Sequence, residues 1–411
     1  MASHSDAEQA DRPVIAGGGI AGLTLAITLA RHGVRSVVLE ARQTPGEAGA
    51  GIQLGPNAAR ILRDIGLLDA LKTFAVSPEG IIVADAASGR QIAELPLGSW
   101  IEKCYGAPYL VVHRADLQAV LLKEATACPE IDLRFDCAVS EADISSRIPN
   151  DQAHPVTLLL HNGGAITAPV LVGADGVWST LRGSVGGDAA RLTYAGMTAA
   201  RALLKAADLP MRLRRSATHV WLAPKAHIVM YPVRRGADVA LVVITASPQP
   251  EQGWGVDVEH RTFLQAFTAM HPDIKAILQA AGNWKRWALF DPKPLPTWSK
   301  AQMTLIGDAA HPVLPFLAQG GAMAIEDAYV LGRLVAKAGP DPQLVFPAYE
   351  ALRRKRVTRV QQASRENGRI YHMSGLMAKG RDLAMRSTPP GLLMQRYDWV
   401  YNWRYNPDLT A

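Results

Sequence analysis

Glycines and one carboxylate near the start of the chain have the spacing of a dinucleotide site. Gly17, Gly19 and Gly22 follow the pattern G-x-G-x-x-G. In this pattern the first glycine makes a tight turn, the second lets a pyrophosphate approach, and the third packs a helix on a strand. Glu40 closes the next apolar run, near the ~20-residue separation at which an acid can bind a ribose diol. We therefore predict a dinucleotide site here.

A second group of such residues lies late in the chain, at Gly307-Asp308 and Gln319–Gly321. Asp308 follows a short apolar run, where its carboxylate could bind a hydroxylated ligand. Glycines at a helix start let backbone N–H groups approach a ligand, and the helix dipole there favours negative charge. Taken alone, the segment is equally typical of an ordinary strand–loop–helix connection.

Three further features lie beside predicted strands or helices: an acid–glycine pair and two arginines. Asp175-Gly176 follows the apolar run 170–173, and Arg182 comes shortly after it. Arg114 opens a predicted helix and could bind a phosphate or form a structural ion pair.

Alternating strands and helices must position these residues. We expect strands at 13–16, 37–39, 170–173 and 303–306, and amphipathic helices after the first and last of them. This alternation indicates an α/β fold with a parallel sheet. Gly49–Asn57 is expected to form a glycine-rich loop.

A second sheet is expected from residues 80–98 together with the runs at 218–222, 227–233 and 239–244. His227 and Tyr231 are four residues apart, so on a strand both side chains point to one face. Without further information, an exposed histidine and a core tyrosine are the more typical interpretation.

Composition limits the protein class. A chain of 411 residues is too long for one core at ~100–200 residues per domain, so two domains are expected. The hydrophobic content is 48%, and no apolar run reaches the ~20 residues of a membrane span. The three cysteines lack metal-site spacing, so we expect no metal and a reduced, cytoplasmic setting. A net charge of +6 does not by itself indicate nucleic-acid binding.

The last part of the chain, 346–411, is predicted to be helical. Apolar residues would pack inward and a basic run would face solvent, as such runs usually do; the run is Arg353, Arg354, Lys355, Arg356 and Arg359. The aromatic residues between 397 and 405 could pack on the core or on a second subunit, so a monomer and a homodimer both stay open.

The motifs resemble those of the class A, single-component FAD-dependent aromatic hydroxylases over residues 13–400. The segment from His227 to Pro232 resembles the salicylate and 3-hydroxybenzoate hydroxylase branch. The resemblance implies a Rossmann-like FAD-binding domain (12–80, 104–188 and 300–345), an inserted β-sheet substrate domain (81–103 and 189–299) and C-terminal helices (346–411). Met230 stands where some members carry another histidine, and Arg201 where relatives often carry a Trp-Arg pair.

The resemblance also implies cofactors and their sites. FAD would bind non-covalently, and NADH or NADPH would act as a transient co-substrate, because the chain has no second G-x-G-x-x-G domain. The implied FAD-binding residues are Gly17, Gly19, Ile20, Ala21, Gly22, Glu40, Arg42, Gly51, Arg114, Asp175, Gly307, Asp308, Pro315, Gln319, Gly320, Gly321 and Ala322.

The chemistry so implied is O2-dependent hydroxylation of a phenolic or hydroxybenzoate-type acid through a C4a-hydroperoxyflavin. His227 and Tyr231 would accept or orient the phenol proton. Three alternatives stay open: a hydroxypyridine, quinolone or polyketide-type ring as substrate; a flavin oxidase or dehydrogenase; and a non-catalytic binding protein on the same fold.

Overall fold

The chain's first layer is a six-stranded sheet with the strand order β19–β20–β12–β2–β3–β8. The structure is a computed structural model, and it describes residues 8–44, 51–144, 155–248 and 255–410. All neighbouring strands in this sheet are parallel except the edge pair β19–β20. The strands are β2 (Val14–Ala16), β3 (Ser36–Leu39), β8 (Ile131–Arg134), β12 (Leu171–Gly173), β19 (Ser299–Lys300) and β20 (Met303–Leu305).

The central strands β2, β3, β12 and β20 are fully buried. Continuous apolar runs of this kind form parallel strands because such strands are covered on both faces. The predicted α/β fold is confirmed. The carboxyl ends of parallel strands lie at one edge of the sheet, so the segments that follow β2, β12 and β20 are brought together there.

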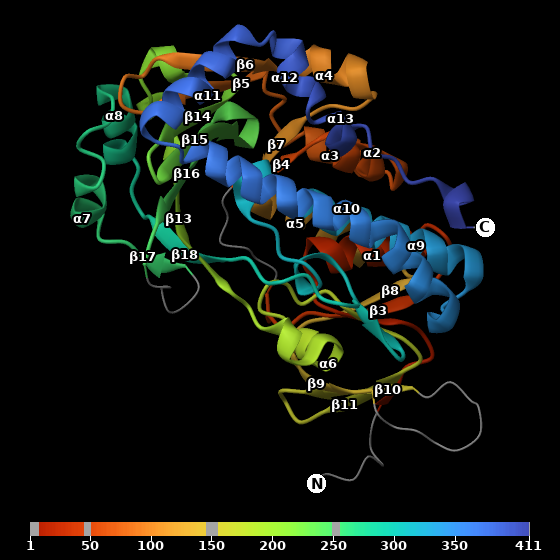
Figure 1. Cartoon of the computed structure of the whole chain (residues 1–411). Helices are drawn as coiled ribbons and strands as arrows, with labels where there is room; N and C mark the ends of the chain where they lie inside the picture. The colour runs from red at the N-terminus through yellow and green to blue at the C-terminus, as the bar shows by residue number, and fades with distance from the viewer. Residues whose placement is uncertain (1–7, 45–50, 145–154, 249–254, 411) are drawn as a thin grey trace.

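Helices cover one face of this sheet, and a four-stranded sheet lies on its other side (Figure 1). Helix α1 (Ile20–Ala30) packs against α9 (Gly320–Ala338) and α5 (Arg114–Ala127). The four-stranded sheet has the order β1–β11–β10–β9. Its strands are β1 (Glu8–Gln9), β9 (Val139–Asp143), β10 (Val156–Leu160) and β11 (Ala165–Ala168).

The expected glycine-rich loop is partly a strand. Residues 51–54 form β4 (Gly51–Leu54), which pairs antiparallel with β7 (Leu110–His113). Residues 49 and 50 lie outside the described part of the chain. The segment is extended because its backbone pairs with β7, about sixty positions away. The glycines within the segment do not indicate that pairing.

An eight-stranded sheet forms the second layer, in the order β17–β18–β13–β16–β15–β14–β5–β6. It joins strands from the two distant stretches expected to share a sheet. They are β5 (Gly80–Asp85), β6 (Gln91–Pro96), β13 (Tyr194–Lys205), β14 (Ala217–Ala223), β15 (Ala226–Val233), β16 (Asp238–Ala246), β17 (Val256–Asp257) and β18 (Lys285–Phe290).

The two faces of β15 have different surroundings. Ile228 and Met230 belong to an apolar cluster with Phe263 and Trp284. Tyr231 belongs to the main core on the opposite face. Alternation along the strand places His227 on the Tyr231 face, as predicted. Met230 therefore points away from the side that carries His227.

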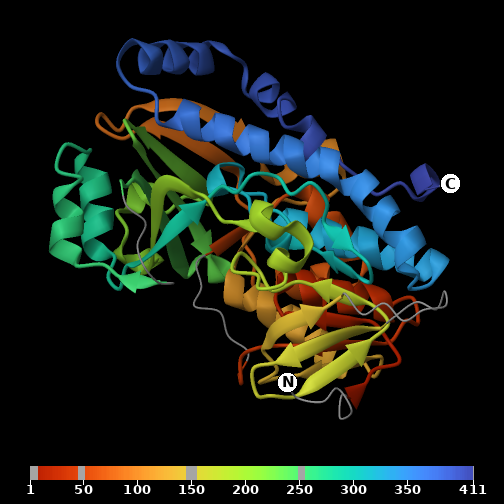
Figure 2. The ribbon, with the colours of Figure 1, turned by 60° about the horizontal axis from the view of Figure 1, so that its bottom comes forward.

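A long helix, α10 (Pro342–Tyr371), begins four residues before the predicted helical segment and spans the molecule (Figures 1 and 2). Beyond it, α11 (Gly375–Ser387) and α12 (Pro390–Gln395) contact β6, and α13 (Asp398–Tyr401) contacts α2. The remaining helices are short: α2 (Pro56–Asp64), α3 (Leu68–Lys72), α4 (Gly98–Tyr105), α6 (Arg182–Gly186), α7 (His260–Gln265) and α8 (Pro272–Ala280).

The prediction that the whole basic run of α10 faces solvent is wrong for Arg353 and Arg356. Their exposed fractions are 0% and 9%. Arg353 donates to Glu326 at 2.6 Å and to Asp327 at 2.7 Å, and Arg356 donates to Glu326 at 2.6 Å. Both guanidinium groups lie over the ring of Trp403. Two acids on α9 make burial of these cations possible, and helical periodicity within α10 alone could not reveal them.

The aromatic C-terminal segment packs on the core of its own chain. Tyr401 is 6% exposed and lies against the rings of Tyr105 and Tyr109. Arg60 donates to the carbonyl oxygens of Tyr401 and Trp403, which ties the segment to α2. Among the described residues, no helix is both long and apolar enough to cross a membrane.

Candidate active site

The turn between β2 and α1 has the shape that its glycines predict. Gly17 has φ +117°, and a Cβ there would lie 2.4 Å from the carbonyl oxygen of Ala174. At Gly22 a Cβ would lie 1.9 Å from the carbonyl oxygen of Gly17. At Gly19 a Cβ would meet no atom within 4 Å. Packing therefore requires glycine at positions 17 and 22, whereas Gly19 faces open space from which a ligand can approach.

Glu40 lies beside this turn. Its carboxylate accepts hydrogen bonds from the backbone N–H groups of Gly18 at 2.9 Å and Arg42 at 3.0 Å. Gln118 of α5 donates to the carbonyl oxygen of Gly18 at 2.6 Å. Gly18, Glu40, Arg42 and Gln118 also line one small cavity with Leu133. The acid predicted to bind a ribose therefore lies directly at the glycine turn.

The segments after β12 and β20 are tied together by Arg182. Its Nε donates to the carbonyl oxygen of Ala309 at 2.7 Å, and its Nη2 donates to that of Asp308 at 2.5 Å. The side chain of Asp175 accepts from the backbone N–H of Thr180 at 3.0 Å. In this arrangement the Asp175 side chain caps its own turn. Arg182 joins the two motifs, although the sequence showed only that it follows Asp175-Gly176.

The carboxylate of Asp308 is the open acceptor of the site. It lies half-buried in a one-turn 3-10 helix that begins at Gly307, whose φ is +60°. Within the described part of the chain, no hydrogen bond engages this carboxylate. Burial raises the pKa of the Asp308 carboxyl, and the nearby charge of Arg114 opposes that rise. A carboxylate partly removed from water needs a hydrogen-bond donor, which a hydroxylated ligand would supply.

The loop from Pro315 to Gln319 leads into α9. Pro315 begins a short 3-10 turn, Ala318 has φ +52°, and α9 begins at Gly320 without a side-chain cap. A Cβ at Gly321 would lie 2.4 Å from Ile52 of β4, whereas at Gly320 it would meet nothing within 4 Å. Within the described residues, no side chain caps the N-terminus of α9, so its first backbone N–H groups and the helix dipole favour an anionic or carbonyl-bearing ligand.

The start of α9 is held by buried polar contacts. The Asn57 amide donates to the side-chain oxygen of Gln319 at 3.0 Å and to Glu326 at 2.7 Å. Ala322 is fully buried one turn into the helix. These contacts connect the start of α2 with the start of α9.

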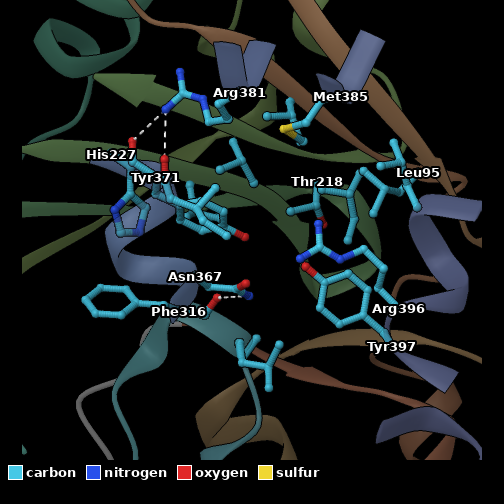
Figure 3. Close-up of a pocket in the computed structure, with 18 of the residues that line it drawn as sticks. Leu95, Thr218, His227, Phe316, Asn367, Tyr371, Arg381, Met385, Arg396 and Tyr397 are labelled. Atoms are coloured by element: carbon cyan, nitrogen blue, oxygen red, sulfur yellow. Dashed lines mark hydrogen bonds between the residues drawn. The ribbon is translucent and has the colours of Figure 1, made fainter. Parts of the chain in front are cut away.

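A cavity of about 490 Å³ lies between the eight-stranded sheet and the C-terminal helices (Figure 3). Most of its wall is apolar, and the wall includes Pro315 and Ala318 of the loop before α9. The lining residues also include Gln53, Tyr109, Thr218, His227, Phe316 and Tyr371.

His227 is 1% exposed and lines this cavity. Figure 3 shows it at the same end as Phe316, with Arg396 at the other end. Its Nδ1 lies 2.8 Å from Nε2 of His372. Burial, together with the neighbouring His372, lowers the pKa of His227 to about 3. At neutral pH the side chain is therefore a neutral imidazole in an apolar wall.

Tyr231 occupies a different position from the one expected at a substrate ring. It is not among the lining residues of this cavity, although it shares a strand face with His227. Its hydroxyl donates to the carbonyl oxygen of Gly51 at 2.8 Å, and burial raises its pKa to about 12. A Cβ at Gly51 would lie 2.2 Å from the Tyr231 ring. Tyr231 thus holds β15 against β4, and this contact explains why position 51 is a glycine.

Sequence reasoning missed Gln53 and Tyr109, which contribute polar groups to the cavity. The Tyr109 hydroxyl donates to the side-chain oxygen of Gln53 at 2.6 Å. Gln53 lies on β4 and Tyr109 directly precedes β7, so the antiparallel pairing of these two strands brings them together. The pairing itself had no local signal.

Residues 12–364 match the model of the family described as "FAD binding domain". The chain is 36% identical over 401 residues to a 3-hydroxybenzoate 6-hydroxylase of Klebsiella oxytoca, covering 97% of this chain and 98% of that protein. The chain belongs to the FAD-dependent aromatic hydroxylases.

Two further relatives agree with this family membership. A 3-amino-4-hydroxybenzoate 2-monooxygenase of Streptomyces platensis is 38% identical, with 96% of this chain and 97% of that protein covered. The solved structure of a salicylate hydroxylase substrate complex superposes with a TM-score of 0.78 at 25% identity, covering 96% of this chain and 95% of that one. This hydroxylase is therefore a flavoprotein monooxygenase with FAD as its cofactor.

The residues of this hydroxylase fit FAD. The open space at Gly19 leaves room for a pyrophosphate, and the Glu40 carboxylate beside the turn could accept from the hydroxyls of a ribose. The Asp308 carboxylate accepts no hydrogen bond from the described residues and could accept one from a hydroxyl of the cofactor. The uncapped N-terminus of α9, at Gly320, adds backbone donors beside the cavity.

Proposed function

We propose that this hydroxylase uses NADH or NADPH and O2 to hydroxylate a phenolic aromatic acid of the hydroxybenzoate type. The observation that carries the proposal is His227, a neutral imidazole in the wall of an otherwise mostly apolar cavity. The named substrates of the relatives support the same class of molecule. When bound, FAD supplies the redox chemistry and the activation of O2.

In this proposal the FAD lies across the edge where β2, β12 and β20 end. Gly17 and Gly22 shape the turn, Gly19 admits the pyrophosphate, Glu40 binds the ribose, and Asp308 accepts from a ribityl hydroxyl. The remaining contacts are assigned to Ile20, Ala21, Arg42, Gly51, Arg114, Asp175, Gly307, Pro315, Gln319, Gly320, Gly321 and Ala322. The same proposal includes an FAD-binding domain at 12–80, 104–188 and 300–345, a substrate domain at 81–103 and 189–299, and C-terminal helices at 346–411.

The cavity would bind the aromatic ring. His227 would accept the phenol proton, which pushes electron density into the ring before oxygen is inserted; a positioned base is commonly worth ~10²–10⁴-fold. Gln53 and Tyr109 would orient polar substituents of the substrate. The apolar wall would exclude water, which limits non-productive release of peroxide. To Tyr231 we assign the support of β4, with no contact to the ring.

The proposal can be tested with the purified, FAD-loaded protein. NADH and NADPH oxidation would be measured against hydroxybenzoates, aminohydroxybenzoates and hydroxylated N-heterocycles, with products identified by mass spectrometry under labelled O2. We expect the label in the product of a hydroxybenzoate-type acid. Turnover without label would identify an oxidase or dehydrogenase, and a colourless protein that binds no FAD would identify a binding protein. Turnover of the N-heterocycles alone would move the substrate class to hydroxypyridines.

A further inference from the structure

Two histidines from distant parts of the chain form a direct pair behind the cavity wall. His227 of β15 and His372, the residue after α10, are 145 positions apart, yet Nδ1 of the first lies 2.8 Å from Nε2 of the second. The centroids of the two rings are 5.0 Å apart. In a neutral pair one nitrogen donates and the other accepts, so this contact can be made with the proton on either ring.

The pair leads from the cavity toward the outside of the molecule. His227 is 1% exposed and lines the cavity. His372 is not among the lining residues, and its side chain is only partly buried. Since Nδ1 of His227 contacts His372, the remaining ring nitrogen, Nε2, is the one available to a ligand in the cavity.

The surroundings hold both rings in this arrangement. Phe316 packs edge-on against each of them, with centroids 5.4 Å from His227 and 5.9 Å from His372. Arg381 of α11 donates to the carbonyl oxygens of Ile370 at 2.9 Å and Tyr371 at 3.2 Å, just before His372 (Figure 3). These contacts hold His372 in place, and because its Nε2 contacts His227, Nδ1 is the nitrogen left for an exchange outside the pair.

We propose that His372 acts through His227 as the exit of a proton path from the substrate hydroxyl to solvent. The phenolic O–H gives its proton to Nε2 of His227. The proton on Nδ1 of His227 passes to Nε2 of His372, and the proton on Nδ1 of His372 passes to water or buffer. The substrate has then lost one proton, and both imidazoles are neutral with their protons on the opposite nitrogens. The reverse sequence returns a proton to the product.

A path of this kind answers a chemical difficulty at His227. A phenol has a pKa near ~10, whereas burial beside His372 lowers the pKa of His227 to about 3. An isolated imidazole of that kind would return the proton to the phenolate at once. Burial also lowers the pKa of His372, so neither ring retains the charge, and the proton continues to solvent.

The test follows proton release and uses two variants of His372. Substrate is mixed rapidly with the oxidised, FAD-loaded enzyme in weak buffer that contains a pH indicator, and the rate of acidification is recorded with product formed per NAD(P)H. His372→Gln can keep a hydrogen bond to His227 but cannot pass a proton. His372→Ala opens space that added imidazole can enter.

We expect proton release and hydroxylation to slow by roughly tenfold or more in both variants, with FAD content and melting temperature unchanged. Added imidazole should restore the rates of proton release and hydroxylation in His372→Ala, and both rates should stay slow in His372→Gln. Parent-like rates in His372→Gln would overturn the proposal, because a hydrogen bond alone would then suffice. Failure of imidazole to restore His372→Ala would overturn it as well.

A matched control is His219→Gln. His219 is another buried histidine whose pKa burial lowers, to about 4, but it stacks on Trp221 and does not line the cavity. His219→Gln should release protons and hydroxylate the substrate at the rates of the parent enzyme. The inference rests on the proposed function, and the two fail differently. If the parent enzyme hydroxylates no phenolic substrate, the proposed function fails; if the parent hydroxylates and His372→Gln matches it, only the proton path fails.

Discussion

The carboxylate of Asp327 accepts a hydrogen bond from the backbone N–H of Gly307 at 3.0 Å, across twenty positions of the chain. The same oxygen lies 2.5 Å from Nε2 of His311, and the other oxygen accepts from Arg353 at 2.7 Å. Asp327 is fully buried on α9. The Asp327 carboxylate therefore holds the turn that presents Asp308, and His311 and Arg353 hold this carboxylate in turn.

Replacing Asp327 by asparagine should destabilise the protein. The variant leaves two buried cations, Arg353 and Arg356, against the single negative charge of Glu326, and breaking a buried ion pair typically costs ~3–5 kcal/mol. Urea unfolding followed by circular dichroism would measure the loss. Asp188→Asn is the control, because Asp188 forms an exposed pair with Arg191 and such pairs contribute ~0–1 kcal/mol. Equal stabilities of the two variants would contradict the role given to Asp327.

The same carboxylate should contribute to acid stability. Burial alone would raise the pKa of Asp327, but His311 and Arg353 outweigh it and hold the pKa at about 2, below its usual 3.8. A depressed folded-state pKa means that the stabilisation is present above the unfolded value and is lost as pH falls. The parent protein should lose stability between pH 3.8 and about 2 more steeply than Asp327→Asn. Unfolding midpoints across that range would check this; parallel curves would argue against it.

Gly19→Val should lose FAD without losing the fold. Among the described residues, no atom lies within 4 Å of a Cβ at this position, so the added carbon enters the space proposed for the pyrophosphate. FAD released from the purified, denatured protein would be quantified by absorbance. Gly282→Val is the matched control, since its Cβ also meets nothing within 4 Å. A Gly19→Val protein that purifies fully yellow would place the pyrophosphate elsewhere.

Asp308→Ala should weaken FAD binding and leave the neighbouring turn in place, because Asp327 holds Gly307 independently. A hydrogen bond to a charged group is worth ~1.5–3 kcal/mol, or roughly ten- to a hundred-fold in Kd. Titration of the apoprotein by fluorescence quenching would measure the change. Asp188→Ala should bind FAD as the parent does, and an unaltered Kd in Asp308→Ala would remove the ribityl contact from the proposal.

His227→Asn should keep FAD bound and uncouple the reaction. Asparagine cannot accept the phenol proton, so hydroxylation should slow by ~10²–10⁴-fold, and NAD(P)H consumed should exceed product formed. Peroxide release and product per NAD(P)H are the measurements. The control is again a substitution at His219, here to asparagine, behind the opposite face of the sheet. Coupling and turnover at the parent level would place His227 outside the site.

Local sequence determined the parts of this protein that depend on neighbours in the chain. The glycine turn at Gly17–Gly22, the acid at Glu40 and the start of α9 at Gly320 were all predictable. In each case the backbone conformation and the strand or helix period are set within a few residues. Parallel strands then bring the ends of β2, β12 and β20 to one edge, so the association of the three motifs also followed from pattern.

The tertiary structure decided which side chains meet across the molecule. Arg353 and Arg356 looked like part of a solvated basic face until α9 supplied Glu326 and Asp327. His227 and His372 become neighbours only because α10 ends beside the eight-stranded sheet. Helical and strand periods say which residues of one element share a face, but the charge, donor or ring opposite that face belongs to another element. Burial of a charge and pairing of two imidazoles depend on that partner, and no local pattern encodes it.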